Sequence, residues 1–326
     1  MRGRRIRVVV SMVALTGLAV VGCSSGDENT GTAGTAGSPG AAAGEGKKVG
    51  LMVQDLSNPF FVSMQHGVEA KAKEIGATLS TQDGRQDLGT QNEQIDAFIQ
   101  QRIDVLLLNA VDSKGIASAV VRAKAAGITV VAVDVAAEGA SATITSNNVQ
   151  AGTQACEYLA TQIAKKGNIL LVNGTPISSV QDRVRGCKQV LAKYPAIKIV
   201  GEQSGDNNRS KALTLATDML TANPNVVGIF GINDPTALGA TLAAEQAGKR
   251  GLVIVGVDGS PEAVKELKKP GTMFKGTPAQ DPNLLGVTGL DMAMKLRKGE
   301  KLAQDTVLVP TKLITAQNVS TYKGWQ

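Results

Sequence analysis

Histidine is nearly absent from this chain of 326 residues, which has a single histidine, His66. Residues 47–326 also contain no Gly-x-Ser-x-Gly turn, no Cys-x-x-Cys pair and no phosphate-binding glycine loop. Serine hydrolases, thiol oxidoreductases, P-loop nucleotide hydrolases and His-rich metal enzymes are recognised by those patterns. We therefore expect no catalytic residue, no metal and no cofactor. Asp134 and Asp258 could mimic the acid pair of a glycosidase, but the strand and helix pattern below gives that interpretation no support.

Strong positive charge is also missing once the first residues are set aside. The chain carries a formal net charge of +6, and four of those charges are Arg2, Arg4, Arg5 and Arg7, with no acidic residue among them. The remainder keeps only +2 and has no block of Lys and Arg. Proteins that bind nucleic acid present a basic face, so we expect no nucleic-acid partner.

Residues 1–22 have the pattern of an export signal. The arginines precede Val8–Val21, an almost wholly apolar run that is shorter than a comfortable membrane span. The run ends in Val20-Val21-Gly22-Cys23, which resembles the lipobox of bacterial lipoproteins. The resemblance implies cleavage before Cys23, lipid attachment to its thiol, and an extracytoplasmic protein anchored to the bacterial cell membrane. The alternative is a signal anchor with an incidental cysteine.

Aromatic and branched aliphatic side chains are absent from residues 24–46. Such a segment cannot bury enough apolar surface to offset the entropy that ordering would cost. We interpret residues 23–47 as a lipidated flexible tether, which leaves the chain from residue 48 onward for the folded part.

Short apolar runs alternate with Ala-rich amphipathic stretches over the rest of the chain. The expected strands are Val49–Gln54, Ala77–Thr81, Val105–Asn109, Thr129–Asp134, Ile169–Asn173, Ile197–Glu202, Val226–Gly231, Val253–Asp258 and Met273–Thr277. The expected helices are Phe61–Ile75, Leu88–Gln101, Lys114–Ala126, Val149–Lys165, Gln181–Lys193, Arg209–Thr221 and Pro235–Ala247. Such alternation is typical of a parallel sheet covered on both faces. Two series of units, meeting near Asn147, predict an α/β fold of two doubly wound lobes.

Several segments at strand ends and helix starts point to one family. They are Ser57-Asn58-Pro59-Phe60-Phe61-Val62, Val133-Asp134, Gln181-Asp182-Arg183-Val184-Arg185-Gly186, Phe230-Gly231-Ile232-Asn233-Asp234-Pro235-Thr236-Ala237-Leu238-Gly239-Ala240 and Val255-Gly256-Val257-Asp258-Gly259. In this order they resemble the periplasmic binding proteins of monosaccharide ABC importers, of the ribose-binding-protein type. The resemblance implies the type I periplasmic-binding-protein fold with a hinge. It places residues 48–146 plus 279–305 in the first lobe and 147–278 plus 306–326 in the second.

The resemblance also implies a ligand site between the lobes. The candidate ligand-binding residues are Asn58, Phe60, Phe61, Asp134, Arg183, Asn233, Asp258 and Gln280, to which we add Gln54 because it ends the first strand. An ionised carboxylate only accepts hydrogen bonds and a guanidinium only donates, whereas a hydroxyl does both. Aspartate and arginine around one hydroxyl therefore orient it, which suits a polyhydroxylated ligand.

Each candidate also has a purely structural interpretation. Asn58 before a proline could be a turn residue. Phe60 and Phe61 could be core, although two adjacent Phe at a strand exit favour one inward and one on ligand. Arg183 could form a surface ion pair, and Asp258 could belong to a turn. We interpret Asp234-Pro235 as a helix N-cap followed by an N1 proline.

Two positions depart from the ribose-binding pattern. Val135 stands where ribose binders carry arginine, and Asn207 aligns with their second aromatic wall. Trp325, the only tryptophan, lies beside the C-terminus, and we do not expect it to replace that wall. Loss of the arginine donor and of the second aromatic wall favours a short acyclic sugar alcohol as the ligand, such as a tetritol or pentitol. The alternative is an ordinary pentose or hexose.

The partners follow from this class. We expect an ABC permease served by a separate ATPase, a small sugar or polyol ligand, and a monomer held to the membrane only by its lipid. A receptor for a membrane sensor is the other interpretation. Sugar-responsive repressors of related fold need an N-terminal helix-turn-helix, and here that position holds the signal and tether. Cys156 and Cys187, on successive expected helices in an oxidising exterior, predict a disulfide, with two buried free thiols as the alternative.

Overall fold

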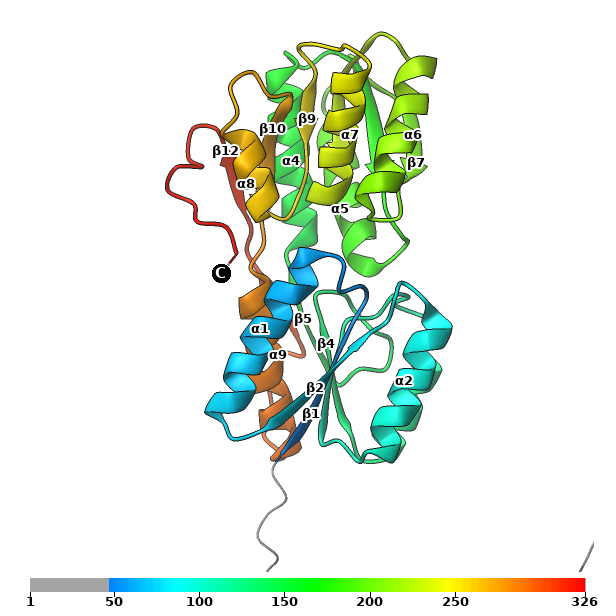
Figure 1. The fold of residues 1–326 in the computed structure, drawn as a ribbon, viewed down its shortest axis with the longest axis vertical. Coiled ribbons are helices and arrows are strands. Elements are labelled where there is room, and N and C mark those ends of the chain that lie inside the picture. The colour runs from blue at the N-terminus through cyan, green and yellow to red at the C-terminus, as the bar shows by residue number, and fades with distance from the viewer. Residues whose placement is uncertain (1–46, 326) are drawn as a thin grey trace, which may run out of the picture. The chain divides into compact units, whose positions relative to one another are not determined.

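The computed structural model describes residues 47–325, which form two lobes, each built on a six-stranded sheet (Figure 1). The strand order is β11-β5-β4-β3-β1-β2 in the first sheet and β12-β10-β9-β8-β6-β7 in the second. Both orders have the doubly wound pattern predicted from the alternating sequence. The signal, Cys23 and the tether lie outside the described residues.

The first lobe is an all-parallel sheet between two helical layers. Its elements are β1 (Lys48–Val53), α1 (Pro59–Glu74), β2 (Thr78–Asp83), α2 (Leu88–Gln100), β3 (Val105–Leu108), α3 (Ala117–Ala125), β4 (Thr129–Val133), β5 (Ala142–Ser146), α9 (Pro282–Arg297) and β11 (Thr306–Val309). Alternate strand residues face opposite layers. Leu51 and Leu107 pack in the core beneath α1 and α9, and Met52 and Leu108 pack in the core beneath α2 and α3.

The second lobe repeats this plan with one antiparallel edge. Its elements are α4 (Asn148–Gln162), β6 (Gly167–Asn173), α5 (Ser178–Leu191), β7 (Ile197–Ser204), α6 (Arg209–Ala222), β8 (Val226–Gly231), α7 (Asp234–Gln246), β9 (Val253–Val255), α8 (Pro261–Leu267), β10 (Phe274–Ala279) and β12 (Lys312–Thr315). Strand β12 runs antiparallel to β10, and the other pairs are parallel.

The last crossing between lobes differs from the expected one. We expected the second lobe from residue 306, but β11 pairs with β5 in the first sheet, and the chain returns to the second lobe only at β12. Strand β11 has four residues and half-exposed side chains, so it lacks the continuous apolar run that marks a buried strand. The chain therefore passes between the lobes after β5, after β10 and after β11.

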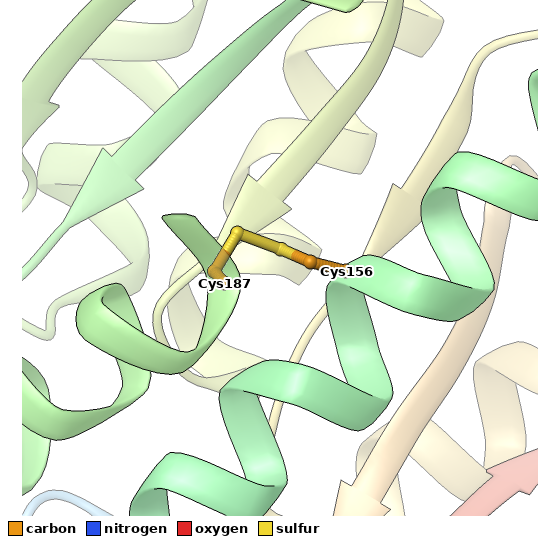
Figure 2. The surroundings of a disulfide bond; sticks show 2 residues. All are labelled: Cys156 and Cys187. Carbon is orange, nitrogen blue, oxygen red and sulfur yellow. A yellow bond between two sulfur atoms is a disulfide. The ribbon is translucent and has the colours of Figure 1, made fainter. Parts of the chain in front are cut away.

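The disulfide between Cys156 of α4 and Cys187 of α5 joins two helices of the second lobe (Figure 2). Both residues are fully buried, and their Cα atoms are 5.1 Å apart. The helices touch backbone to backbone, because a Cβ atom on Gly152 would lie 2.0 Å from the carbonyl oxygen of Arg183. A Cβ on Gly186 would lie 2.1 Å from the carbonyl oxygen of Val149. This close packing fixes the position of Arg183 relative to α4.

Candidate functional site

A cavity of about 40 Å³ lies between the lobes at the carboxyl ends of their strands. All nine residues predicted for the ligand site line it, namely Gln54, Asn58, Phe60, Phe61, Asp134, Arg183, Asn233, Asp258 and Gln280. Its other lining residues are Gln86, Ile177, Ser179, Val180 and Asn207. The fold thus brings together residues that are more than 200 positions apart in the sequence, such as Asn58 and Gln280.

Arg183 is the centre of the polar network in this cavity. Its Nε donates to Oδ1 of Asn148 at 2.9 Å, and its Nη1 donates to the carbonyl oxygen of Ile232 at 3.0 Å and to Oδ1 of Asp258 at 3.3 Å. Nε2 of Gln280 donates to the same Asp258 oxygen at 2.8 Å. Arg183 and Asp258 are 5% and 3% exposed, so the alternative of a surface ion pair is wrong.

Asp134 supplies a second buried carboxylate, from the first lobe. Nδ2 of Asn109 donates to its Oδ2 at 3.0 Å, while its Oδ1 is buried without a hydrogen-bond partner. Oε1 of Gln280 is also buried and unpartnered. A buried acceptor without a donor is costly, so both atoms mark positions where a ligand hydroxyl would be stabilising.

Burial controls the ionisation of both carboxyls. Loss of water raises the pKa of Asp134 to about 6, and the Arg183 charge and the Asn109 hydrogen bond oppose that rise. Loss of water likewise raises the pKa of Asp258 to about 6, again opposed mainly by Arg183. One guanidinium thus faces two carboxylates. Above pH 6 both carboxyl groups are predominantly ionised, and an ionised carboxylate only accepts hydrogen bonds.

Both carboxylates also sit on strained backbone. Asp134 has φ = 67° and Asp258 has φ = 138°, a region that L-residues rarely adopt. The backbone around them is held by neighbouring strands, since the Asp134 N–H donates to Ile144 and the Asp258 N–H to Pro278. Strain of this kind is concentrated at functional sites.

Asn58 and Asn233 each cap a helix beside the cavity. The side-chain oxygen of Asn58 accepts from the Phe60 N–H, and that of Asn233 accepts from the Thr236 N–H. Capping with the oxygen leaves the amide NH₂ as the group that can donate elsewhere. The expected N-cap at Asp234 is wrong, because Asn233 makes the capping box with Thr236 and Asp234 is the first helical residue.

Asp234 has a structural environment of its own. Its Oδ2 accepts from the Ser260 N–H at 2.7 Å, and it is fully buried. Burial and the nearby charge of Asp258 hold its pKa well above the ordinary range. Asp234 therefore stabilises the turn that contains Asp258 and does not line the inner cavity.

The aromatic residues form one wall. Phe60 and Phe61 are both buried and meet edge to face, with ring centroids 5.4 Å apart. Trp325 packs edge to face on Phe60 at 5.3 Å, and its Nε1 donates to the carbonyl oxygen of Asp258 at 2.9 Å. Trp325 is not among the residues that line the inner cavity, which agrees with the expectation that it does not replace the second aromatic wall.

The two departures from the ribose-binding pattern have clear positions. Val135 is fully buried in the apolar core and offers the cavity no donor. Asn207 has φ = 57°, and its Nδ2 donates to Oγ1 of Thr175 at 2.9 Å, while its Oδ1 is buried and unpartnered. A small polar group therefore stands at the position of the missing ring.

A larger cavity of about 460 Å³ adjoins the first one. It shares Asn58, Gln86 and Asn207 with the inner cavity. Its other lining residues come from both lobes and include polar and charged side chains as well as the apolar Pro59, Pro235, Leu238 and Trp325. Arg209 and Lys211, which line it, are already paired with Glu262 and Asp206. Arg209 and Lys211 are therefore not unpaired cations that would attract an anion to the outer cavity.

Sequence reasoning missed several residues of this network. Asn109 directly follows β3, so the rule that ligands lie beyond strand ends would have found it. Asn148 and Gln86 carry no comparable signal, because one lies in the first turn of a helix and the other in a loop. Trp325 is joined to the site only by tertiary packing.

The family model for the periplasmic binding protein domain matches residues 49–301 of this chain. The chain belongs to the periplasmic binding protein family. The ribose import binding protein of Bacillus subtilis is 33% identical over 270 residues, covering 82% of this chain and 87% of the relative. The xylitol-binding protein of Mycolicibacterium smegmatis is 30% identical over 314 residues, covering 95% of this chain and 85% of the relative.

Solved structures of this family share the fold. A solute-binding protein of an ABC transporter from Mycobacterium smegmatis, crystallised with bound glycerol, superposes with a TM-score of 0.82 at 30% identity and covers 86% of this chain and 98% of its own. The predicted resemblance to sugar-binding proteins of ABC importers is confirmed, and so is the type I fold. A periplasmic binding protein of this group is a transport receptor and not an enzyme.

Within residues 47–325 no group of three or more His, Cys, Asp and Glu side chains is placed to hold a metal ion. No helix in that range is both long and apolar enough to span a bilayer.

Proposed function

We propose that this periplasmic binding protein binds a short-chain sugar alcohol, a tetritol or a pentitol, between its lobes and delivers it to the permease of an ABC importer. The observation that carries the proposal is the cavity between the lobes in which Asp134, Arg183, Asp258 and Gln280 converge beside a single aromatic wall. The permease would recognise the closed form, and a separate ATPase would supply the energy.

Hydrogen-bond chemistry supports a neutral polyol. Oδ1 of Asp134 and Oε1 of Gln280 are buried acceptors without a partner, and the Asn58 amide and the Arg183 guanidinium are donors at the same cavity. A hydroxyl placed between a carboxylate and a guanidinium donates to the first and accepts from the second. Hydrogen bonds to charged groups contribute about 1.5–3 kcal/mol each, against about 1 kcal/mol for neutral pairs.

Shape supports a small acyclic ligand. A sugar ring has two apolar faces that suit two aromatic walls, whereas this site has only the Phe60 and Phe61 wall. The names of two relatives, with xylitol and glycerol as ligands, agree with this class.

A pentose is the second candidate ligand, because the Bacillus subtilis relative is named for ribose import. The two candidates differ in a measurable way. A site built to bond each hydroxyl discriminates strongly against a ligand that leaves a buried polar group unpaired.

The test is a thermal-shift screen followed by competitive calorimetry with erythritol, xylitol, ribitol, D-arabitol, D-ribose and D-glucose. We expect one alditol of four or five carbons to bind most tightly. Asp134→Asn should weaken that binding at least tenfold, while Asp218→Asn, the same change on the exposed face of α6, should not. Ribose or glucose binding tenfold tighter than every alditol would overturn the sugar-alcohol proposal.

We also propose that Cys23 carries the lipid that anchors the protein outside the cytoplasm. The proposal rests on the lipobox-like segment Val20-Val21-Gly22-Cys23. Cells fed a radiolabelled fatty acid should label the wild-type protein and not Cys23→Ala, and the variant should be released from the membrane fraction. Equal labelling of both proteins would contradict the anchor.

A further inference from the structure

Trp325 lies outside the inner cavity but touches two residues that line it. Its indole N–H donates to the carbonyl oxygen of Asp258 at 2.9 Å, and its ring meets the edge of Phe60 with centroids 5.3 Å apart and planes at 84°. It is the only tryptophan of the chain and is half-buried. Sequence reasoning gave this residue no role in the site.

The two contacts of Trp325 lie on different lobes. Asp258 follows β9 in the second lobe, and Phe60 is in the first turn of α1 in the first lobe. The segment after β12, red in Figure 1, is fixed to the second lobe because Val319 is buried in the second-lobe core and the Tyr322 hydroxyl donates to the carbonyl oxygen of Gly259 at 2.9 Å. The second lobe therefore carries Trp325, and its ring packs with the apolar core of the first lobe.

The position of the Asp258 carboxylate depends on the backbone that Trp325 bonds. Asp258 has φ = 138°, and its carbonyl oxygen accepts from both the Gln280 N–H and the Trp325 indole. Its carboxylate accepts from Arg183 and from Gln280. Holding the carbonyl against rotation therefore also holds the carboxylate that faces the ligand cavity.

We propose that Trp325 is a positioning residue that couples closure of the lobes to the geometry of the ligand site. Its ring stabilises the closed state by packing on Phe60, and its N–H keeps the Asp258 turn in place. The proposal rests on the proposed function as far as ligand affinity is concerned, whereas the contact of the Trp325 ring with Phe60 can be tested separately from binding. Loss of the ring should mainly speed ligand dissociation, because a contact made only on closure stabilises the closed complex.

The first experiment compares Trp325→Phe, Trp325→Ala and the matched control Tyr322→Phe in the full-length protein, with xylitol as the probe and ribose as the second probe. Tyr322→Phe removes one hydrogen bond to the same turn and leaves the ring on Phe60. We expect affinity to fall less than about threefold for Tyr322→Phe, about threefold to tenfold for Trp325→Phe, and about tenfold to fiftyfold for Trp325→Ala. Retention of radiolabelled probe should show that the Trp325→Ala loss lies in the dissociation rate.

A merely structural role for Trp325 predicts a different result. The melting temperature of the unliganded protein would then fall in Trp325→Ala while the dissociation rate of the probe stayed at the wild-type value. That outcome, or equal affinities for Trp325→Ala and Tyr322→Phe, would overturn the proposal. Trp325→Phe keeps the test decisive if the alanine variant does not fold.

The second experiment measures the ring contact directly, and its first comparison needs no ligand. Acrylamide quenching of the single tryptophan should be stronger in Phe60→Leu than in wild type, because removing the Phe60 ring uncovers the indole. Added probe should lower quenching in wild type more than in Phe60→Leu. Equal quenching in both proteins, with and without probe, would mean that the ring contact does not form in solution and the inference is wrong. Failure of xylitol and ribose to bind wild type would count against the proposed ligands alone, since the quenching still decides the contact.

Discussion

Arg183 carries the most demanding role at the scale of single residues, since one guanidinium serves Asn148, Ile232 and Asp258 in a buried place. Removing one partner of such a network leaves the others desolvated and unpaired. Variants of the network should therefore be compared in two quantities, the ligand affinity and the free energy of unfolding.

Arg183→Ala and Asp258→Ala should each weaken ligand binding by about 2 kcal/mol, or about thirtyfold. Both variants should stay folded, and Arg183→Ala should lose more stability because the acceptors on Asn148 and Ile232 lose their Arg183 donor, whereas the Asp258 oxygen keeps the Gln280 donor. Calorimetry measures the affinity, and thermal unfolding the stability. Arg185→Ala, on the same helix but in an exposed pair with Asp182, is the control and should change neither. Wild-type affinity in both site variants would show that the site is misplaced.

Asp134 should make the stability of the unliganded protein depend on pH. Burial raises its pKa from 3.8 to about 6, so the folded protein favours the neutral carboxyl more than the unfolded chain does. The stabilising contribution of that raised pKa is complete below pH 3.8 and is lost as the pH rises through 6. Asp134→Asn, which stays neutral, should therefore gain stability relative to wild type between pH 4 and 7, by about 1–3 kcal/mol. Urea unfolding of both proteins at several pH values measures this, and parallel pH profiles would contradict it.

Ligand affinity should change with pH in the opposite sense. An ionised Asp134 can accept a hydrogen bond from a ligand hydroxyl at Oδ1, whereas a protonated carboxyl loses part of its capacity to accept. Affinity should therefore fall as the pH drops below 6, and the fall should be smaller in Asp134→Asn. A binding constant that is unchanged between pH 5 and 7.5 would argue against contact between the ligand and this carboxyl.

The residues of the site were predictable where they end a strand or open a helix. Gln54, Asp134 and Asp258 follow strands, and parallel strands present those ends at one edge of a sheet. Trp325 was not predictable, because nothing in the sequence places a residue of the last segment against Phe60. Asn148 likewise enters the site only because α4 and α5 touch at glycines.

At the scale of elements, the close α4–α5 contact decides where Arg183 stands. Gly152 and Gly186 allow the two backbones to touch, and the disulfide joins the helices one turn further along α4 from Gly152. The pair of Cys156 and Cys187 was predicted from its place on successive helices. Strand β5 was missed because buried and half-exposed residues alternate along it.

Cys156→Ala together with Cys187→Ala should lower the free energy of unfolding by about 2–4 kcal/mol, since the bond closes a loop with a sequence separation of 31 residues. Ligand affinity should change less than threefold, because the Gly152 and Gly186 contacts still align the helices. Urea unfolding and calorimetry measure the two quantities. Free thiols at these positions in unfolded, oxidised protein, or a variant as stable as wild type, would contradict the role of the bond.

At the scale of the whole molecule, the cavity has walls from both lobes, so one ligand should protect both. With xylitol bound, hydrogen exchange should slow together at residues 58–61 of the first lobe and at 233–236 and 258–260 of the second. The amides of α2 and α6, on outer faces, serve as internal controls and should change little. Protection confined to one lobe would show that the ligand does not bridge the cleft.

The three passages of the chain between the lobes have a consequence for how the protein is made. The first sheet gains its edge strand only when β11 has been synthesised, and the second sheet gains β12 only when residues 312–315 have been synthesised. Neither sheet is therefore complete until nearly the whole chain has been made. Contacts between segments so far apart in sequence slow folding. A polypeptide that crosses a membrane before it folds would benefit from such a delay, because the first lobe lacks α9 and β11 until most of the chain has been synthesised.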